Sequence, residues 1–169
     1  MRANRTLLAL AVVAVLLLGS MEKPARTEKR SGTGADHEWE HLLPAFAQRL
    51  RAVFAALVAR GYDPYLHEGL RSRARAESLA SDGSGIKDSM HIYGAAADVI
   101  SASRHWEWPE FFAALGEESE RLGLTWGGRF ARKDLDHVQA VPVSMQPRMR
   151  AAASATAAND LAKKALGVA

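Results

Sequence analysis

An unbroken apolar run from Leu7 to Leu18 is the feature that most constrains how this chain can fold. Arg2 and Arg5 precede the run, and a basic segment followed by 12 apolar residues is typical of a secretory signal peptide. A membrane-spanning helix usually needs roughly 20 apolar residues, which is more than this run offers. We therefore expect residues 1–20 to be either a signal peptide or an uncleaved signal anchor, in which case residues 6–19 tether the chain to a membrane.

The segment after the apolar run, residues 21–38, is charged and rich in Gly, Ser, Thr and Pro, as in a flexible linker. Subtracting both segments leaves about 130 residues, enough for one globular core but not for two. We expect that domain at residues 39–145, followed by an alanine-rich helical tail at 146–169. A signal segment with basic residues on its cytoplasmic side implies export, to the periplasm or another extracytoplasmic location.

Cysteine is absent, which excludes disulfides, thiolate metal sites and cysteine nucleophiles. A metal site must then be built from His, Asp and Glu, a ligand set that favours catalytic zinc. The net charge of +3 suits an anionic polymer such as cell wall, membrane surface or nucleic acid, but it is also common in proteins without such a partner. No nucleic-acid recognition motif is present, so we expect neither DNA nor RNA as a partner. We also expect the chain to be a monomer.

The periodicity of apolar residues predicts an α+β fold with a small antiparallel sheet flanked by helices. The expected helices cover residues 39–60, 73–80, 109–122 and 150–166, and the expected strand regions are 62–70, 92–100, 124–126 and 137–141. The region 92–100 is expected to start with a turn at Gly94 and then become a strand, and residues 81–87 are expected to form a flexible loop.

The chemistry is concentrated in two short stretches, and the first contains His91 and Asp98. Seven residues separate them, so a regular strand would place their side chains on opposite faces. The glycine and alanines between them permit a tight turn, after which both side chains can converge. Asp98 lies within an otherwise apolar strand, where an uncompensated carboxylate is costly to bury, and a metal ion is one good compensation.

The second stretch holds Asp134, His137 and Gln139. With His91 and Asp98, His137 completes two imidazoles and one carboxylate, a three-ligand zinc set that leaves a fourth position for water. Gln139 shares a strand face with His137, whereas Asp134 belongs to the preceding turn, from which it could act as general base. Taken singly, each residue also has an ordinary interpretation, as a packing histidine, a turn cap or a solvated charge. Their coincidence is what favours a site.

The pattern Ser-x-His-x-x-Gly-x-Ala-x-Asp, followed some forty residues later by Asp-x-x-His, resembles the zinc D-alanyl-D-alanine carboxypeptidases and L-alanyl-D-glutamate endopeptidases. This family of peptidoglycan peptidases includes vancomycin-resistance carboxypeptidases and phage endolysins. The resemblance implies that His91, Asp98 and His137 bind Zn²⁺ and that Asp134 is the catalytic base. It extends over about residues 40–142.

Three further residues take their expected roles from this resemblance. Arg71, in the segment Glu68-Gly-Leu-Arg-Ser, would hold the scissile carbonyl or its oxyanion. Trp126, in a Trp-Gly-Gly turn, would line the substrate groove, and Ser89 would bind substrate or orient His91. Gln139 is counted with these substrate-binding residues, although several relatives carry Glu at its position.

The resemblance implies a zinc metallopeptidase that hydrolyses peptidoglycan stem peptides in cell-wall remodelling or lysis. The alternative is a non-catalytic wall-binding module of the same fold, and a third interpretation is a structural membrane-tethered protein whose basic face binds lipid. An intact Asp134 favours the enzyme, because binding alone needs no base. Substrate preference stays open, since Leu70, Arg129, Asp136 and Gln139 depart from the usual pattern.

Overall fold

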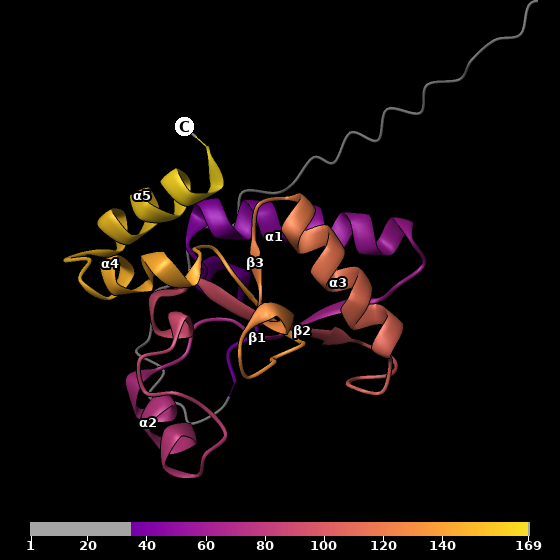
Figure 1. The fold of residues 1–169 in the computed structure, drawn as a ribbon, viewed down its shortest axis with the longest axis horizontal. Coiled ribbons are helices and arrows are strands. Elements are labelled where there is room, and N and C mark those ends of the chain that lie inside the picture. Colours follow the sequence, from indigo (N-terminus) through magenta and orange to yellow (C-terminus); the bar gives the residue numbers. More distant parts are fainter. Residues whose placement is uncertain (1–34, 169) are drawn as a thin grey trace, which may run out of the picture. The chain divides into compact units, whose positions relative to one another are not determined.

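The computed structural model describes residues 35–168 (Figure 1). The predicted signal segment at 1–20, and all but the end of the predicted linker, lie outside the described residues. Within 35–168, no helix combines the length and the hydropathy that crossing a membrane requires.

A four-stranded antiparallel sheet forms the centre of the domain. Its strands are β1 (Pro64–Glu68), β2 (Ala96–Ser101), β3 (Thr125–Trp126) and β4 (His137–Gln139), arranged in the order β1-β2-β4-β3. Each neighbouring pair is antiparallel. The predicted small antiparallel sheet of an α+β domain is therefore confirmed.

One face of the sheet is covered by the long helices α1 (Pro44–Ala59) and α3 (Pro109–Arg121) (Figure 1). Ala97 and Val99 of β2 and Val138 of β4 point to this face and have no exposed surface. They share a hydrophobic core with the apolar side chains of both helices. Because successive side chains of a strand point to opposite faces, the polar residues adjacent to these three in sequence lie on the other face of the sheet, here called the open face.

Helix α1 starts five residues later than its apolar pattern predicts, at Pro44. Proline suits the first turn of a helix, because its missing N–H has no partner there. The residues predicted to begin the helix instead form a separate 3-10 turn, η1 (Trp39–His41).

The alanine-rich tail forms two helices rather than the single predicted one, α4 (Gln146–Arg150) and α5 (Ala155–Leu166). The chain breaks between them and restarts at Ser154, whose hydroxyl accepts a hydrogen bond from the Ala157 N–H. Helix α5 packs on α1, and the Asn159 side chain accepts a hydrogen bond from the Ala45 N–H at the start of α1. The tail thus contributes to the same core as the sheet.

Helix α2 (Arg73–Ser81) lies apart from α1 and α3 in Figure 1 and buries only one apolar residue, Ala76. Its N-terminus is capped by the Ser72 hydroxyl, which accepts from the Arg75 N–H at 3.1 Å. The loop after it, residues 82–89, leads directly to His91.

Candidate metal centre

Three polar residues lie side by side on the open face of the sheet. Glu68 of β1 pairs with Asp98 of β2, and Asp98 pairs with His137 of β4. Residues opposite one another on antiparallel strands project to the same face, so one row across three strands carries all three side chains. A β-bulge between Leu66 and Glu68 shifts the register of β1 and brings Glu68 opposite Asp98.

His91 joins this row from outside the sheet, on the 3-10 turn η2 (Met90–Tyr93). Gly94 ends the turn with a left-handed backbone, φ 62°, which reverses the chain before β2 begins. A Cβ at Gly94 would also lie only 2.6 Å from the His41 carbonyl oxygen. Glycine is therefore required here twice over, and it resolves the odd spacing of His91 and Asp98 as the sequence predicts.

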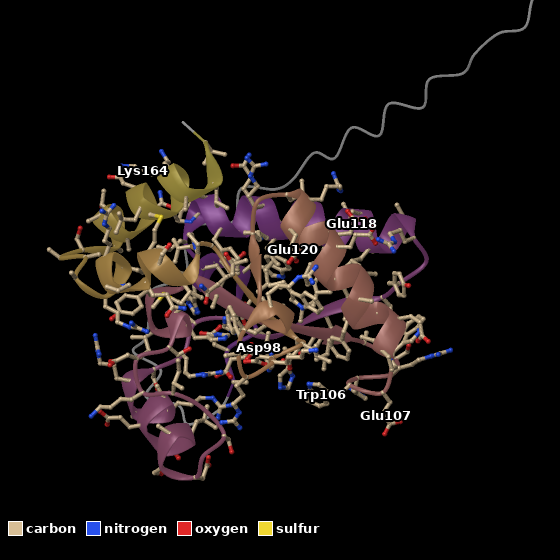
Figure 2. The ribbon with its side chains drawn as sticks, in the orientation of Figure 1. Asp98, Trp106, Glu107, Glu118, Glu120 and Lys164 are labelled. Carbon is tan, nitrogen blue, oxygen red and sulfur yellow. The ribbon has the colours of Figure 1, made fainter. Side chains whose placement is uncertain are left out.

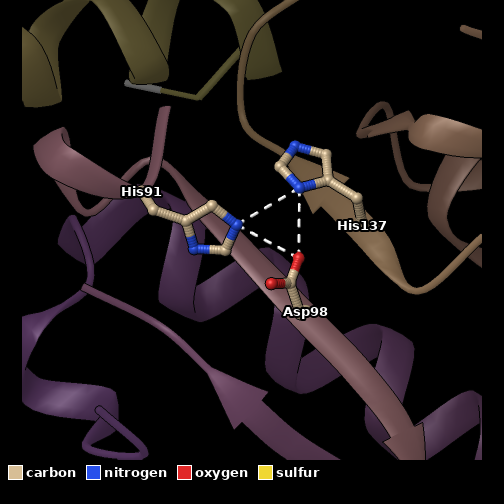
Figure 3. Close-up of side chains that lie close together, drawn as sticks. All are labelled: His91, Asp98 and His137. Carbon is tan, nitrogen blue, oxygen red and sulfur yellow. Dashed lines mark hydrogen bonds and ion pairs between the residues drawn. The ribbon is translucent and has the colours of Figure 1, made fainter. Parts of the chain in front are cut away.

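The side chains of His91, Asp98 and His137 converge on one point (Figure 3). Nε2 of His91 lies 3.1 Å from Oδ1 of Asp98 and 3.2 Å from Nδ1 of His137, and that Nδ1 lies 3.2 Å from the same Oδ1. The two imidazoles have 1% and 7% of their surface exposed. The three residues thus form a compact, nearly buried cluster of potential ligands.

The tautomer of His91 is fixed by a backbone carbonyl. Nδ1 of His91 lies 2.7 Å from the Gly69 carbonyl oxygen, which can only accept a hydrogen bond. In the neutral ring, Nδ1 therefore carries the proton, and Nε2 presents its lone pair to the cluster.

The tautomer of His137 is fixed in the same way through Gln139. The Gln139 amide NH₂ donates to the Val141 carbonyl oxygen, so its own Oε1 faces Nε2 of His137 at 3.2 Å. Gln146 donates a second hydrogen bond to this Oε1 at 3.1 Å. Nε2 of His137 must therefore carry the proton, and Nδ1 presents its lone pair to the cluster.

The proton positions on the two imidazoles show whether a metal ion could fit among these residues. Two imidazole lone pairs and the Asp98 carboxylate oxygen point at one another within 3.2 Å, with no hydrogen atom between the neutral rings. Three acceptors in such contact repel one another unless a cation lies among them. Two imidazoles and a carboxylate are also the ligands that catalytic zinc sites use, and hydrogen bonds from the far ring nitrogens are the usual support for such ligands. The donor set fits a divalent metal ion.

The electrostatics of the cluster are consistent with a cation site. Burial by itself raises the pKa of Asp98, but the two histidines outweigh it and hold that pKa well below its usual range. Burial lowers the pKa of His137, but the hydrogen bond to Asp98 outweighs this effect, so the net result is a raised pKa. Without a metal, the cluster is therefore expected to hold a proton at the same place.

Arg71 lies beside the cluster in a buried network of ion pairs. Its Nη2 donates to Oε2 of Glu68 at 2.6 Å and lies 3.3 Å from Oδ2 of Asp98. Arg75 donates from Nε to the other oxygen of Glu68 at 2.6 Å. Burial raises the pKa of Glu68, but the two arginines reverse the effect and lower it. Glu68 therefore stays ionised and holds Arg71 against the potential metal ligands.

Asp134 lies on the turn before β4, as the sequence predicts. The His137 N–H donates to the Asp134 carbonyl oxygen at 3.4 Å, which closes this turn. Protein atoms crowded around the carboxylate raise the pKa of Asp134 to about 6, and the neighbouring Asp136 adds to the rise. Part of the residue remains exposed to solvent, so this carboxyl can exchange protons with water near neutral pH.

The cluster opens onto a cavity of about 480 Å³. Ser89 contributes to its wall and also caps η2, where its hydroxyl accepts from the His91 N–H at 3.4 Å. Among the residues predicted for the site, the cavity wall includes seven: Arg71, Ser89, His91, Asp98, Asp134, His137 and Gln139.

Trp126 does not contribute to this cavity wall, in contrast to its predicted place in the substrate groove. Its indole packs against α3, where a Cβ at Gly116 would lie 2.4 Å from the ring. Its Nε1 donates to the Leu135 carbonyl oxygen at 2.8 Å. Trp126 thus anchors the loop that carries Asp134 to the core.

Glu68 and Gln146 support the site but received no role from the sequence. A buried acid in the strand Pro64–Glu68 is as unusual as Asp98 in its strand, so the same argument would have singled out Glu68. Gln146 reaches Gln139 only because the tail folds back over the site, and we see no sequence signal for that contact.

Comparisons with known proteins bear on this geometry. Residues 82–140, which include all three potential metal ligands, match the sequence model of D-alanyl-D-alanine carboxypeptidases. The fold is similar to the crystal structure of the Serratia marcescens L-Ala D-Glu endopeptidase ChiX, with a TM-score of 0.53 and 26% sequence identity over 60% of this chain and 81% of that one. The comparison with curated proteins found no match.

Proposed function

The domain around residues 82–140 belongs to the D-alanyl-D-alanine carboxypeptidase and L-alanyl-D-glutamate endopeptidase family, and from this premise we propose that it is a zinc-dependent peptidase of peptidoglycan stem peptides. The observation that carries the proposal is the convergence of two imidazole lone pairs and a carboxylate at the edge of a cavity. The fold similarity to an L-Ala D-Glu endopeptidase favours the bond between L-Ala and D-Glu as the one cleaved.

Zn²⁺ would be held by Nε2 of His91, Nδ1 of His137 and the carboxylate of Asp98. When bound, such an ion supplies a Lewis acid and lowers the pKa of a bound water to about 7. The Gly69 carbonyl and the Gln139 amide keep both imidazoles in the tautomer that this role needs.

Asp134 moves the proton in the proposed reaction. Its carboxylate would accept a proton from the attacking water as the new C–O bond forms at the peptide carbonyl carbon. The same carboxyl would then donate this proton to the departing amine nitrogen as the C–N bond breaks. Burial raises the pKa of Asp134 to about 6 in the metal-free protein, and the positive charge of a bound ion would lower it again, so the carboxylate would be ionised and able to accept a proton at neutral pH.

Arg71 would stabilise the negative charge that develops on the carbonyl oxygen. Its guanidinium is held by Glu68 at the wall of the cavity. A charged donor fixed in place before the reaction is the arrangement that stabilises an oxyanion most effectively.

We further propose that the chain is exported, because stem peptides lie outside the cytoplasmic membrane. The apolar run Leu7–Leu18 would direct export or anchor the chain, and residues 21–38 would let the domain reach the wall.

The proposal is tested by digesting purified sacculi and identifying the products by mass spectrometry, with and without a chelator. We expect new fragments cut between L-Ala and D-Glu that disappear with the chelator and return with added Zn²⁺. Loss of a terminal D-Ala instead would identify a carboxypeptidase. Tight binding to sacculi without any cleavage by zinc-loaded protein would indicate a non-catalytic wall-binding module and contradict the proposal.

A further inference from the structure

Four ring side chains form a continuous row near the metal centre, here called the aromatic shelf: His37, Tyr65 and Trp106, which are exposed, and His67, which is half-buried. Neighbouring ring centroids lie 5.6 Å apart for Tyr65 and His37, 6.1 Å for His37 and His67, and 4.9 Å for His67 and Trp106. Tyr65 keeps 42% and Trp106 53% of its surface exposed. Large aromatic side chains grouped at a surface commonly mark an interaction site.

The aromatic shelf lies on the same face of the sheet as the metal centre. Tyr65 pairs with Ile100, which is two residues from Asp98 on β2, so Tyr65 and Asp98 project to one face. His67 is the extra residue of the β-bulge and directly precedes Glu68, the residue opposite Asp98. Figure 2 shows Asp98 and Trp106 on the side of the sheet away from α1.

Trp106 connects the aromatic shelf to the cavity wall. Its Nε1 donates to Oδ2 of Asp136 at 2.8 Å, and Asp136 lines the cavity together with Asp134. The residue before it, His105, has a left-handed backbone with φ 51°, in a tight turn closed by paired hydrogen bonds with Ser101. A non-glycine residue in this region is strained, and such strain persists where the surrounding structure enforces it. The turn presents the indole at the edge of the site.

The chemistry of the shelf suits a neutral ligand with both apolar and polar faces. Burial lowers the pKa of His67, so its ring is uncharged at neutral pH. Aromatic rings offer a flat apolar surface and, at their edges, polar atoms for hydrogen bonds. A pyranose ring matches this pattern, because its C–H groups form apolar patches and its hydroxyl and acetamido groups form hydrogen bonds.

We propose that the aromatic shelf binds the amino-sugar strand of peptidoglycan next to the stem peptide that is cut. This inference rests on the proposed function and specifies its substrate as glycan-linked peptide. In peptidoglycan the stem peptide joins the sugar through its L-Ala, so a cut between L-Ala and D-Glu falls one residue from the sugar. An enzyme that makes this cut must bind the sugar close to its metal centre, and the aromatic shelf lies on the same face of the sheet as that centre.

Sugar binding is tested directly with the trimer of N-acetylglucosamine, by NMR titration of the tryptophan indole signals. Replacing Trp106 by Phe identifies its indole signal and keeps an aromatic ring. We expect the trimer to shift the Trp106 signal, and Trp106→Ala and Tyr65→Ala each to weaken binding at least tenfold. Val58→Ala, at a 60% exposed position on α1, is the control and should bind normally. Absence of binding to the unmodified protein, or unchanged affinity in both shelf variants, would overturn the proposal.

The second test compares cleavage of intact sacculi with cleavage of free stem peptides. For Trp106→Ala we expect the ratio of the two rates to fall about tenfold, with Trp106→Phe restoring most of it. An equal loss on both substrates would show that Trp106 acts only through Asp136, and would refute a role in sugar binding. If the unmodified protein cleaves neither substrate, the proposed peptidase function fails, while the NMR titration still decides whether the shelf binds sugar.

Discussion

Replacing Glu68 by Ala should destabilise the metal-free protein more than any surface charge change. The Glu68 and Arg71 side chains have only 4% and 9% of their surface exposed, and their atoms lie 2.6 Å apart. Removing the carboxylate leaves the Arg71 guanidinium buried, with Asp98 at 3.3 Å as its remaining ion-pair partner. Breaking a buried pair from one side typically costs about 3–5 kcal/mol. For a domain of this size, that corresponds to a midpoint of thermal unfolding roughly 10–20 °C lower.

Chemical and thermal unfolding, followed by circular dichroism in the presence of a chelator, would measure this difference. The control is Glu117→Ala, since Glu117 pairs with Arg60 at 2.8 Å but is 67% exposed. An exposed pair of this kind contributes about 0–1 kcal/mol. A loss below about 1 kcal/mol for Glu68→Ala, or equal losses for both variants, would refute the reasoning that Glu68 anchors a buried charge network.

The pH dependence gives this prediction a second readout. The folded protein lowers the pKa of Glu68 below its ordinary 4.5, so the ionised carboxylate stabilises the fold fully above that value. The stabilisation is lost as pH falls through the lowered pKa of the folded state. The difference between the unmodified protein and Glu68→Gln should therefore narrow below about pH 4.5. A difference that stays constant down to pH 2 would show that packing, not charge, is responsible.

Three other predictions follow from the site and its supports. Gln139→Leu should weaken zinc affinity about 10–100-fold in a competition assay with a chelating dye. Gln139→Glu keeps an acceptor for His137 and should weaken zinc affinity far less. Equal effects of the two variants would argue that Gln139 does not control the tautomer of His137. Asp134→Asn should lower turnover about 10²–10⁴-fold with zinc retained. Because the base must be ionised, activity of the zinc-loaded enzyme should fall in acid as Asp134 becomes protonated. The pKa of Asp134 is about 6 in the metal-free protein and lower beside a divalent cation, so a rate unchanged from about pH 7 down to about pH 4 would contradict this role. Gly116→Ala should destabilise the fold by about 1–3 kcal/mol in denaturant unfolding, since its Cβ would meet Trp126 at 2.4 Å, and unchanged stability would refute that contact.

Local patterns were sufficient to predict the fold class and most helices and strands. The reason is that apolar periodicity follows directly from burial, as at Phe46, Leu50, Val53 and Leu57 of α1. The turn at Gly94 was predictable because only a residue without Cβ fits both its backbone and its contact with His41. An acid in an apolar strand likewise identified Asp98 as a residue in need of compensation.

Features that depend on register and long-range packing could not be predicted. The β-bulge that brings Glu68 opposite Asp98 changes which strand residues share a face, and no local pattern reveals it. The contact of Gln146 with Gln139 requires the tail to pack back on the sheet, which no local pattern reveals. The aromatic shelf could not be predicted from the sequence either, because its rings come from segments as far apart as residues 37 and 106.

The most direct test of the metal centre is a crystal structure of the zinc-loaded protein with anomalous data at the zinc absorption edge. We predict a single peak in the cavity, about 2.0–2.2 Å from Nε2 of His91, Nδ1 of His137 and a carboxylate oxygen of Asp98. A zinc ion bound elsewhere, or one bound through the opposite nitrogen of either imidazole, would contradict the account.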